Sequence, residues 1–241
     1  MSIDRRISYK VVFDTETAPI VKGVIDGDKS LVYDFGYAIV DKRGKVYLTR
    51  SFVVSEIFDG EKELMSSAYY NEKIPNYIKD IENGTRIKAN FYTIRNTFLA
   101  DLEEYGIINL YAHNAMFDYK ALNRTMRWIT NDKYRYFFPK KYVLHDTNKM
   151  ACSVVQYTPT YKRFCENNGY LTNHKPIRRP QTKAEILYRY ITQNNEFVES
   201  HTGLEDVMIE KEILAYCYKK HKAIKSKLFK EVAWLPFIIV L

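Results

Sequence analysis

The chain has 241 residues, of which 46% are hydrophobic, 15% aromatic and 27% charged, so it is long enough to bury a core of its own. With only 9 Gly and 7 Pro, the composition excludes a disordered, collagen-like or low-complexity chain. Lysine and arginine (37) outnumber aspartate and glutamate (29), for a formal net charge of +8. Such a surplus attracts polyanions, but solvated surface lysines also produce it, so charge alone does not identify a partner.

The cysteine pattern and the apolar runs indicate a compartment. Cys152, Cys165 and Cys217 are far apart and form no Cys-x-x-Cys pair, which predicts reduced core thiols. Residues 1–10 contain no secretory signal, and the longest apolar run, 232–241, is about half of what a membrane-spanning helix needs. We expect that run to form a final strand or docking segment, and the protein to be cytoplasmic and to have no membrane span.

Three strands are predicted first along the chain. Ser8–Phe13 is rich in β-branched and aromatic residues and predicts a buried strand that ends at Asp14-Thr15-Glu16. Leu31–Val40 and Lys45–Val54 predict two more strands, and the turn Asp41–Gly44 joins them into an antiparallel hairpin. Between residues 55 and 105 the apolar spacing of three and four predicts two or three covering helices.

Short strands and helices alternate in the rest of the chain. Strands are predicted at 107–111 and 141–144, and helices at 115–128, 183–192 and 203–220. Asn114 is expected to cap the first of these helices, and a capping box from Thr202 to Glu205 begins the last. Residues 153–180 have no strong period and predict a loop with at most short elements. The order predicts one α/β domain, residues 1–241, around a mixed sheet with antiparallel first strands flanked by helices.

Acidic side chains occur where predicted elements end or begin. Asp14 and Glu16 are two residues apart on a strand, so both carboxylates point to one face, where a cation could neutralise them. Asp118 falls in the first turn of a helix, where it would also complement the helix dipole. His201 and Asp206 flank the start of the last helix. Taken singly, each of these is better explained without a functional site: Asp14 and Glu16 by a solvated strand end, Asp118 by a helix start, and His201 with Asp206 by a surface histidine beside a helix start.

Taken together and in this order, the acidic residues resemble a known enzyme family. Phe13-Asp-Thr-Glu16, His113-Asn-Ala-Met-Phe-Asp118 and His201-Thr-Gly-Leu-Glu-Asp206 look like the three motifs of the DEDDh exonucleases. This group includes the proofreading subunit of bacterial DNA polymerase III, ribonuclease T and oligoribonuclease. His145-Asp146-Thr147 looks like the strand-end Asp-Thr that the family has between its second and third motifs.

The resemblance spans about residues 9–220, and its convincing matches are confined to these short blocks. Thr17-Ala18-Pro19 replaces the family's usual Thr-Gly after the first motif, and Gly203-Leu204 replaces its common Ala-Leu. An insertion-like segment, about residues 157–195, is the most divergent part and would reshape the substrate entrance. These departures put the choice of substrate in doubt more than the chemistry.

The resemblance implies an RNase H-like fold and a 3′→5′ exonuclease that releases nucleoside monophosphates from single-stranded ends, with DNA favoured over RNA. Asp14, Glu16, Asp118 and Asp206 would bind two Mg²⁺ or Mn²⁺ ions, since carboxylate oxygens suit these hard cations. The ions would clamp the scissile phosphate, and His201 would act as the general base for the attacking water. All five residues are therefore expected to be catalytic.

Further side chains are candidates for binding the substrate. They lie in the first motif, in the second motif and in a basic stretch interleaved with aromatic residues, and comprise Thr15, Thr17, Asn114, Phe117, Arg178 and Arg179. A solvated basic loop explains the two arginines equally well, and a core position is the favoured alternative for Phe117. A homodimer or an association with a polymerase is left open by the sequence.

Two other functions remain open from the sequence. The first is an inactive nuclease fold that serves as a nucleic-acid-binding or scaffolding module, which the basic charge favours and the complete set of catalytic-type residues disfavours. The second is an HD-type nucleotide phosphohydrolase built on His113, His145-Asp146 and Asp206. The three predicted leading strands argue against that helical enzyme class.

Overall fold

One six-stranded sheet forms the centre of the molecule in the computed structural model, which describes residues 3–68, 71–173, 178–220 and 223–226. The strand order is β4-β3-β2-β1-β5-β6. The antiparallel part is made by β1 (Lys10–Pro19), β2 (Ser30–Val40) and β3 (Val46–Val54), as predicted. The strands β4 (Ile87–Ala89), β5 (Asn109–Ala112) and β6 (Val143–Asp146) pair with their neighbours in parallel. The predicted mixed sheet is confirmed.

Strand β1 runs further than predicted. It continues through Asp14 and Glu16 to Pro19, because β2 pairs with it along this whole length, and its register shifts at a bulge between Glu16 and Thr17. Alternation then determines which side each residue faces. Val11 and Phe13 lie in one core cluster and Val12 in the other, so Asp14 and Glu16 lie on the side of Val12.

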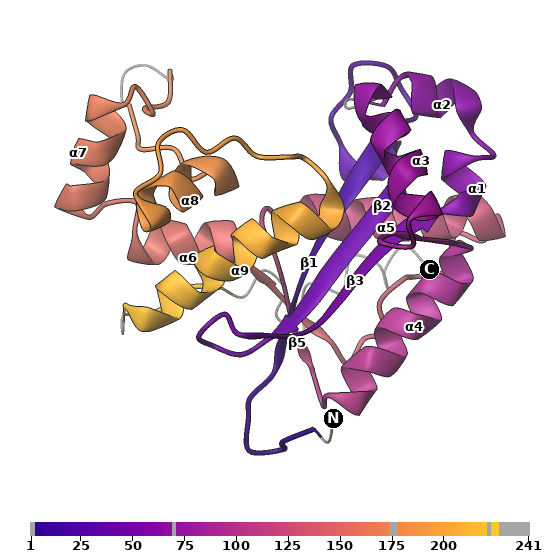
Figure 1. The fold of residues 1–241 in the computed structure, drawn as a ribbon, viewed down its shortest axis with the longest axis horizontal. Helices are drawn as coiled ribbons and strands as arrows, with labels where there is room; N and C mark the ends of the chain where they lie inside the picture. Colours follow the sequence, from indigo (N-terminus) through magenta and orange to yellow (C-terminus); the bar gives the residue numbers. More distant parts are fainter. Residues whose placement is uncertain (1–2, 69–70, 174–177, 221–222, 227–241) are drawn as a thin grey trace.

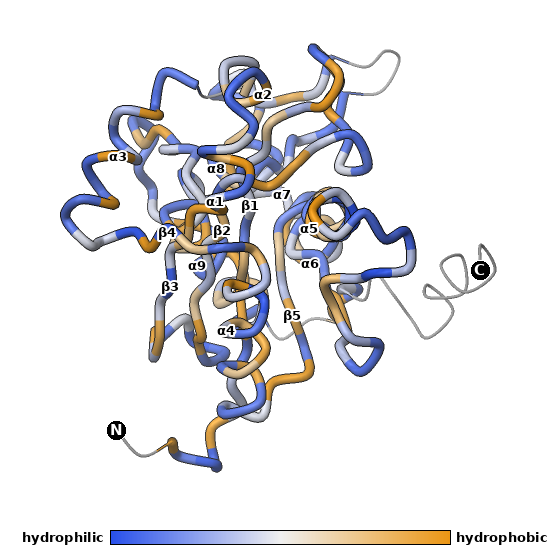
Figure 2. Tube along the Cα trace, turned by 90° about the vertical axis from the view of Figure 1, so that its right-hand side faces the viewer, coloured by the Kyte–Doolittle hydropathy of each residue, from blue (hydrophilic) through white to orange (hydrophobic). Residues whose placement is uncertain are grey.

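Helices cover both faces of the sheet (Figure 1). One group comprises α1 (Ser55–Phe58), α2 (Lys62–Ser66), α3 (Ile74–Glu82), α4 (Phe91–Glu104) and α5 (Met116–Thr130), with the 3₁₀ turns η1 (Gly27–Lys29) and η2 (Asn71–Lys73). The other group comprises α6 (Thr147–Val154), α7 (Pro159–Asn167), α8 (Ala184–Thr192) and α9 (Gly203–Lys219). Many of the loops that project outward are hydrophilic, whereas the strands and helices contain both hydrophilic and hydrophobic stretches (Figure 2). Each face therefore has its own hydrophobic core, as expected for a sheet buried on both sides.

The two cores differ in composition. The core beneath α4 and α5 is aromatic, with Phe13, Phe35 and Phe98 in mutual ring contact and Phe137 against two of them. The core beneath α6, α8 and α9 is mainly aliphatic and includes Leu187. Helix α9 lies across the sheet on this second face, which is also the face of Asp14 and Glu16 (Figure 1).

Some predicted elements need correction. The stretch 153–180, predicted as a loop with at most short elements, contains the nine-residue helix α7, which was not located from the sequence. Thr158 caps this helix and Pro159 begins it, a start signal that the weak periodicity had obscured. The region 55–105 holds the short helices α1 and α2 and the strand β4 in addition to α3 and α4. A three-residue strand leaves too short a pattern to be recognised.

The predictions on cysteines and on membrane spans have separate outcomes. Cys152, Cys165 and Cys217 are all free thiols, and the last two are buried, as expected. Among the helices that the structure describes, none combines the length and the apolar character needed to cross a membrane. The run 232–241, predicted as a final strand or docking segment, lies outside the described residues.

Candidate active site

Carboxylates from a strand and a helix meet at one end of the sheet. Asp14 and Glu16 extend from β1, and Asp206 extends from the first turn of α9. One carboxylate oxygen from each of the three lies within 4.8 Å of the others. Glu199, His201 and Asp206 form a second group with the same spread, so Asp206 belongs to both groups. The structure thus brings together the first and third motifs.

Asp118 reaches the same place from the opposite helical layer. It lies in the first turn of α5, is 2% exposed, and its Oδ1 accepts a hydrogen bond of 2.7 Å from the Thr15 hydroxyl. Its charge also raises the pKa of Asp14, second only to the effect of burial. Thr15, predicted to bind substrate, uses its hydroxyl to position Asp118.

The backbone before α5 differs from the prediction. Asn114 does not cap the helix, because its φ is +61°, α5 begins at Met116, and Ala115 at the N-cap makes no side-chain bond. The N–H of Asn114 instead donates to Asp146 Oδ1 at 3.1 Å. Asp146 ends β6 and caps α6 by accepting from Asn148 N at 2.8 Å. The predicted strand-end aspartate thus ties the second motif to the neighbouring strand.

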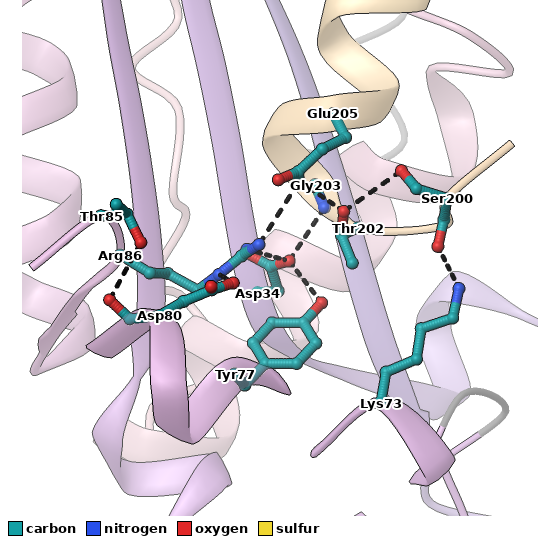
Figure 3. Close-up of polar contacts among 10 residues, drawn as sticks. All are labelled: Asp34, Lys73, Tyr77, Asp80, Thr85, Arg86, Ser200, Thr202, Gly203 and Glu205. Atoms are coloured by element: carbon teal, nitrogen blue, oxygen red, sulfur yellow. Dashed lines mark hydrogen bonds and ion pairs between the residues drawn. The ribbon is translucent and has the colours of Figure 1, made fainter. Parts of the chain in front are cut away.

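Three charged side chains near the site were missed by the sequence analysis. Glu210 is one helical turn after Asp206 on α9, is 2% exposed and accepts from the backbone N–H of His113 at 3.2 Å. The four-residue spacing from Asp206 was a signal for it, because residues i and i+4 share a helix face. Glu199 precedes His201, and Lys73 from η2 donates to the carbonyl of Ser200 (Figure 3). No local pattern links Lys73 to the three motifs.

Burial and mutual repulsion set the protonation of the cluster. Burial raises the pKa of Asp118 to about 7. Burial, followed by the charge of Glu199, raises that of Asp206 to about 8. The pKa values of Asp14 and Glu16 are raised well above their ordinary range, first by burial and then by neighbouring carboxylates. In the absence of a cation, the cluster therefore holds protons at neutral pH.

The donor set fits a divalent cation of the Mg²⁺ type. The first group offers only carboxylate oxygens, which are the ligands that hard cations prefer. Asp206 is 6% exposed, and its Oδ1 is buried with no hydrogen-bond partner among the described residues. A buried acceptor without a donor is costly, and a bound cation would remove that cost together with the repulsion.

His201 lies in the loop immediately before α9. Its φ of +52° is unusual for a residue with a side chain, and Nδ1 lies 3.7 Å from Glu199 Oε2. Burial and the charge of Lys73 lower the pKa of His201. The imidazole is therefore neutral at pH 7 and able to accept a proton.

A cleft of about 950 Å³ opens beside the carboxylates. Asp14, Asp206 and Glu210 line it, and so does the segment 179–184, which we call the second wall. Three consecutive carbonyls hold this second wall, since Pro180 O accepts from Gln156 Nε2 (2.8 Å), Gln181 O from Tyr161 Oη (2.6 Å), and Thr182 O bonds to His113 Nε2 (2.7 Å). The wall is therefore tied to α7, to the turn after α6 and to the residue that follows β5.

The predicted substrate-binding residues are placed differently around this cleft. Asn114 and Arg179 line it, whereas Arg178 is exposed and is not among its lining residues. Thr17 is half-buried on β1, just after the bulge. Phe117 is half-buried and belongs to neither core cluster of the described residues, so the favoured core position is not supported.

The histidines expected for an HD-type site do not gather with Asp206. His145 bonds through its two ring nitrogens to Ser226 and Asn109, and it stacks on Tyr111. The ligand groups found among the described residues contain neither His113 nor His145. The six-stranded sheet also contradicts a helical enzyme of that class.

Comparison with known proteins identifies the fold. No family model and no curated protein matches the sequence. A solved full-length 3′-exonuclease is similar in structure, with a TM-score of 0.54 and 13% identity over 93% of this chain and 66% of that one. Exonuclease X bound to 5′-overhanging duplex DNA (TM-score 0.44, 16% identity, 88% and 92% covered) and S. pombe Pop2p with Mg²⁺ and Mn²⁺ (0.45, 14%, 90% and 84%) were also found. The predicted RNase H-like α/β fold is confirmed.

Proposed function

We propose that this RNase H-like protein is a metal-dependent 3′→5′ exonuclease that releases nucleoside monophosphates from single-stranded ends, with DNA favoured over RNA. The observation that carries the proposal is the convergence of carboxylate oxygens from Asp14, Glu16 and Asp206 within 4.8 Å, with Asp118 buried beside them. A 3′-exonuclease of the same fold supports it. No comparable cluster of oxygen ligands is found elsewhere in the part of the chain that the structure describes.

Each residue of the site has a part in the proposed hydrolysis. Two Mg²⁺ or Mn²⁺ ions, held by Asp14, Glu16, Asp118 and Asp206, would activate the attacking water and stabilise the leaving 3′ oxygen. A ring nitrogen of neutral His201 would accept the proton of that water. Glu199, 3.7 Å from Nδ1, would stabilise the imidazolium that results. Thr15 holds Asp118 in place throughout.

The second wall of the cleft would receive the nucleic-acid backbone. Arg179 and Lys183 line the same cleft as the carboxylates, and cations in such a groove attract phosphates. Because three carbonyl contacts hold the wall, it would present these cations in a fixed position. We therefore infer that the segment around residues 157–195 governs which nucleic-acid ends enter.

The proposal is tested by a time course on 5′-labelled single-stranded DNA and RNA of one sequence, with Mg²⁺, Mn²⁺ or EDTA. We expect a ladder that shortens from the 3′ end, stops in EDTA, and runs faster on DNA. Asp118→Ala should lower the rate by more than about 100-fold, beyond the loss typical of residues that only support a metal ligand.

Asp132→Ala is the matched control, because it removes an exposed carboxylate after the same helix. This variant should digest at the wild-type rate, and circular dichroism should show both variants folded. Wild-type activity in Asp118→Ala would refute the site. Intact substrate with salt-sensitive binding by the wild-type protein would favour the inactive nucleic-acid-binding module instead.

A further inference from the structure

The carboxylate of Asp34 lies between the sheet and the start of α9, outside the three motifs (Figure 3). It is on β2 and 0% exposed. A single oxygen, Oδ2, accepts three hydrogen bonds: from Tyr77 Oη at 2.6 Å, from Arg86 Nη1 at 2.8 Å and from the backbone N–H of Gly203 at 2.8 Å. Asp34 thus joins α3, the segment before β4 and α9 at one point.

Asp34 performs the capping that the local sequence of α9 does not. Thr202 occupies the N-cap position but makes no side-chain cap bond, and its hydroxyl donates to Glu205 instead. The first N–H of α9, that of Gly203, is bound by Asp34 from across the fold. A carboxylate at a helix N-terminus also complements the helix dipole. The start of α9 is therefore anchored to β2.

The backbones of β2 and α9 are in direct contact at this point. A Cβ at Gly36 would overlap the backbone of Gly203 and Leu204, and a Cβ at Gly203 would lie 2.9 Å from Gly36 N. Only two glycines allow so close an approach. Lateral movement of the first turn of α9 is thus limited on the side of the sheet.

Asp34 is also the cross-strand partner of Glu16. The register of β1 and β2 pairs Glu16 with Asp34, and directly opposite residues share one face of a sheet. Asp206 is the third residue after Gly203, which Asp34 binds. Glu16 is therefore connected to Asp206 in three short steps: the strand pairing to Asp34, the hydrogen bond from Gly203 to Asp34, and the first turn of α9.

Arg86 supplies the charge that a buried carboxylate needs. It is 3% exposed, and besides Asp34 it binds Glu205 Oε2 at 3.3 Å, in the first turn of α9. Its guanidinium lies 4.4 Å from the ring centre of Tyr77, which itself donates to Asp34. Tyr77 and Arg86 thus fix the position of the Asp34 carboxylate, which in turn binds the first N–H of α9.

We propose that Asp34, held by Tyr77 and Arg86, is a positioning residue that sets the placement of Asp206 relative to Glu16. The inference rests on the proposed function, because it concerns the geometry of the same metal ligands. A first turn of α9 released from Asp34 would carry Asp206, and the preceding His201, out of register with β1. Catalytic groups must be held to within about 0.5 Å of their productive geometry, so such a shift lowers turnover.

The test compares two buried tyrosines of the same aromatic core, each of which donates a hydrogen bond to a carboxylate that also binds an arginine. Tyr77→Phe removes the hydroxyl that binds Asp34. Tyr37→Phe is the matched control, since Tyr37 is equally buried and donates to Asp101 Oδ2 at 2.6 Å, where Arg50 Nε also binds at 3.1 Å. The contact of Tyr37 involves Asp101 on α4 and Arg50 on β3, and no residue of α9. Asp34→Asn, which keeps the shape and removes the charge, is the stronger variant.

Four quantities are measured on the full chain: kcat and KM on single-stranded DNA, Mn²⁺ affinity by calorimetry, and Tm. Tyr77→Phe should lower kcat and Mn²⁺ affinity by about 10-fold and Asp34→Asn by up to about 100-fold, as for outer partners of metal ligands. KM should stay within about twofold, because the nucleic-acid wall is not touched. Tyr37→Phe should lose as much Tm as Tyr77→Phe and keep wild-type kcat and Mn²⁺ affinity.

The opposite results would overturn the inference. Wild-type kcat and Mn²⁺ affinity in Tyr77→Phe would do so, as would equal losses in Tyr37→Phe, which would show a merely structural role. If Asp34→Asn does not fold, Tyr77→Phe decides alone. A wild-type protein that binds Mn²⁺ and digests nothing refutes the proposed function only, and the Mn²⁺ affinities still decide the role of Asp34. A wild-type protein that does not bind Mn²⁺ overturns both.

Discussion

Neighbouring side chains of the same type can have different surroundings, as Arg178 and Arg179 show. Both are exposed, but only Arg179 lines the cleft beside Asp14 and Asp206. The backbone of Arg179 is held by Thr172, whose Oγ1 accepts from its N–H at 3.0 Å and whose N–H donates to its carbonyl at 2.8 Å. The sequence predicts substrate binding for both arginines, and the structure places Arg179 in the cleft that Asp14 and Asp206 also line.

This difference leads to a prediction for nucleic-acid binding. Arg179→Ala should weaken binding of single-stranded DNA and reduce the slope of log affinity against log salt by about 0.7, the value for one lost phosphate contact. Arg178→Ala should have the smaller effect on both quantities. Fluorescence anisotropy in EDTA between low and moderate salt measures them without digestion. If Arg178→Ala weakened binding more than Arg179→Ala, the nucleic-acid backbone would have to run along the outer surface of the segment 179–184, outside the cleft.

Helix α9 contributes more of the site than any other helix. It carries Asp206 and Glu210 on one face, and its first turn contacts β2 backbone to backbone at Gly36 and Gly203. Its predicted bounds, 203–220, are confirmed within one residue by Gly203–Lys219. The helical pattern of the sequence does not predict where that first turn lies on the sheet. Asp34 and the two glycines determine its position.

A methyl group at the contact should therefore disturb the whole helix. Gly36→Ala should lower the free energy of unfolding by about 3 kcal/mol or more, because the clash is with backbone that has no rotamer to change. Gly84→Ala is the control, because a Cβ at Gly84 would meet no neighbouring atom. Its only penalty is the positive φ of +73°, which should lower the free energy of unfolding by about 1–2 kcal/mol. Urea unfolding measures both, and equal losses would contradict the close approach.

At the scale of the whole molecule, buried acidic groups gather in the site although the chain carries a net charge of +8. Asp206 has a pKa of about 8 in the folded state against a usual 3.8, and Asp118 one of about 7. Between the usual and the raised values the folded state binds more protons than the unfolded state, so the free energy of unfolding falls as pH rises. Buried, unneutralised carboxylates thus oppose folding at neutral and alkaline pH.

The pH dependence of stability should reveal this charge. In EDTA we expect Tm to fall by several degrees between pH 5 and pH 8.5, at about 2–4 °C per kcal/mol. Saturating Mn²⁺ should raise Tm most at the alkaline end, because the cation stabilises the ionised carboxylates. Asp206→Asn should flatten the dependence in EDTA. Differential scanning calorimetry measures Tm, and a slope that neither Mn²⁺ nor Asp206→Asn changes would contradict the account.

The sequence alone determined the features that depend on local periodicity. Alternation on a strand placed Asp14 and Glu16 on one face, and helix start signals placed Asp206 in the first turn of α9. The order of strands and helices was enough to predict the mixed sheet, and the three short motifs were enough to predict the RNase H-like fold. Periods of 2 and 3.6 residues are properties of the backbone itself, so they can be recognised before any tertiary contact is known.

Only the tertiary structure decided which distant residues meet. Asp34 lies opposite Glu16 because of the β1–β2 register, and it binds Gly203 across 169 residues. The left-handed backbone of Asn114 and the anchoring of the wall by His113 likewise follow from long-range packing. Register and close approach are set by how whole faces bury one another, and no window of a few residues contains that information.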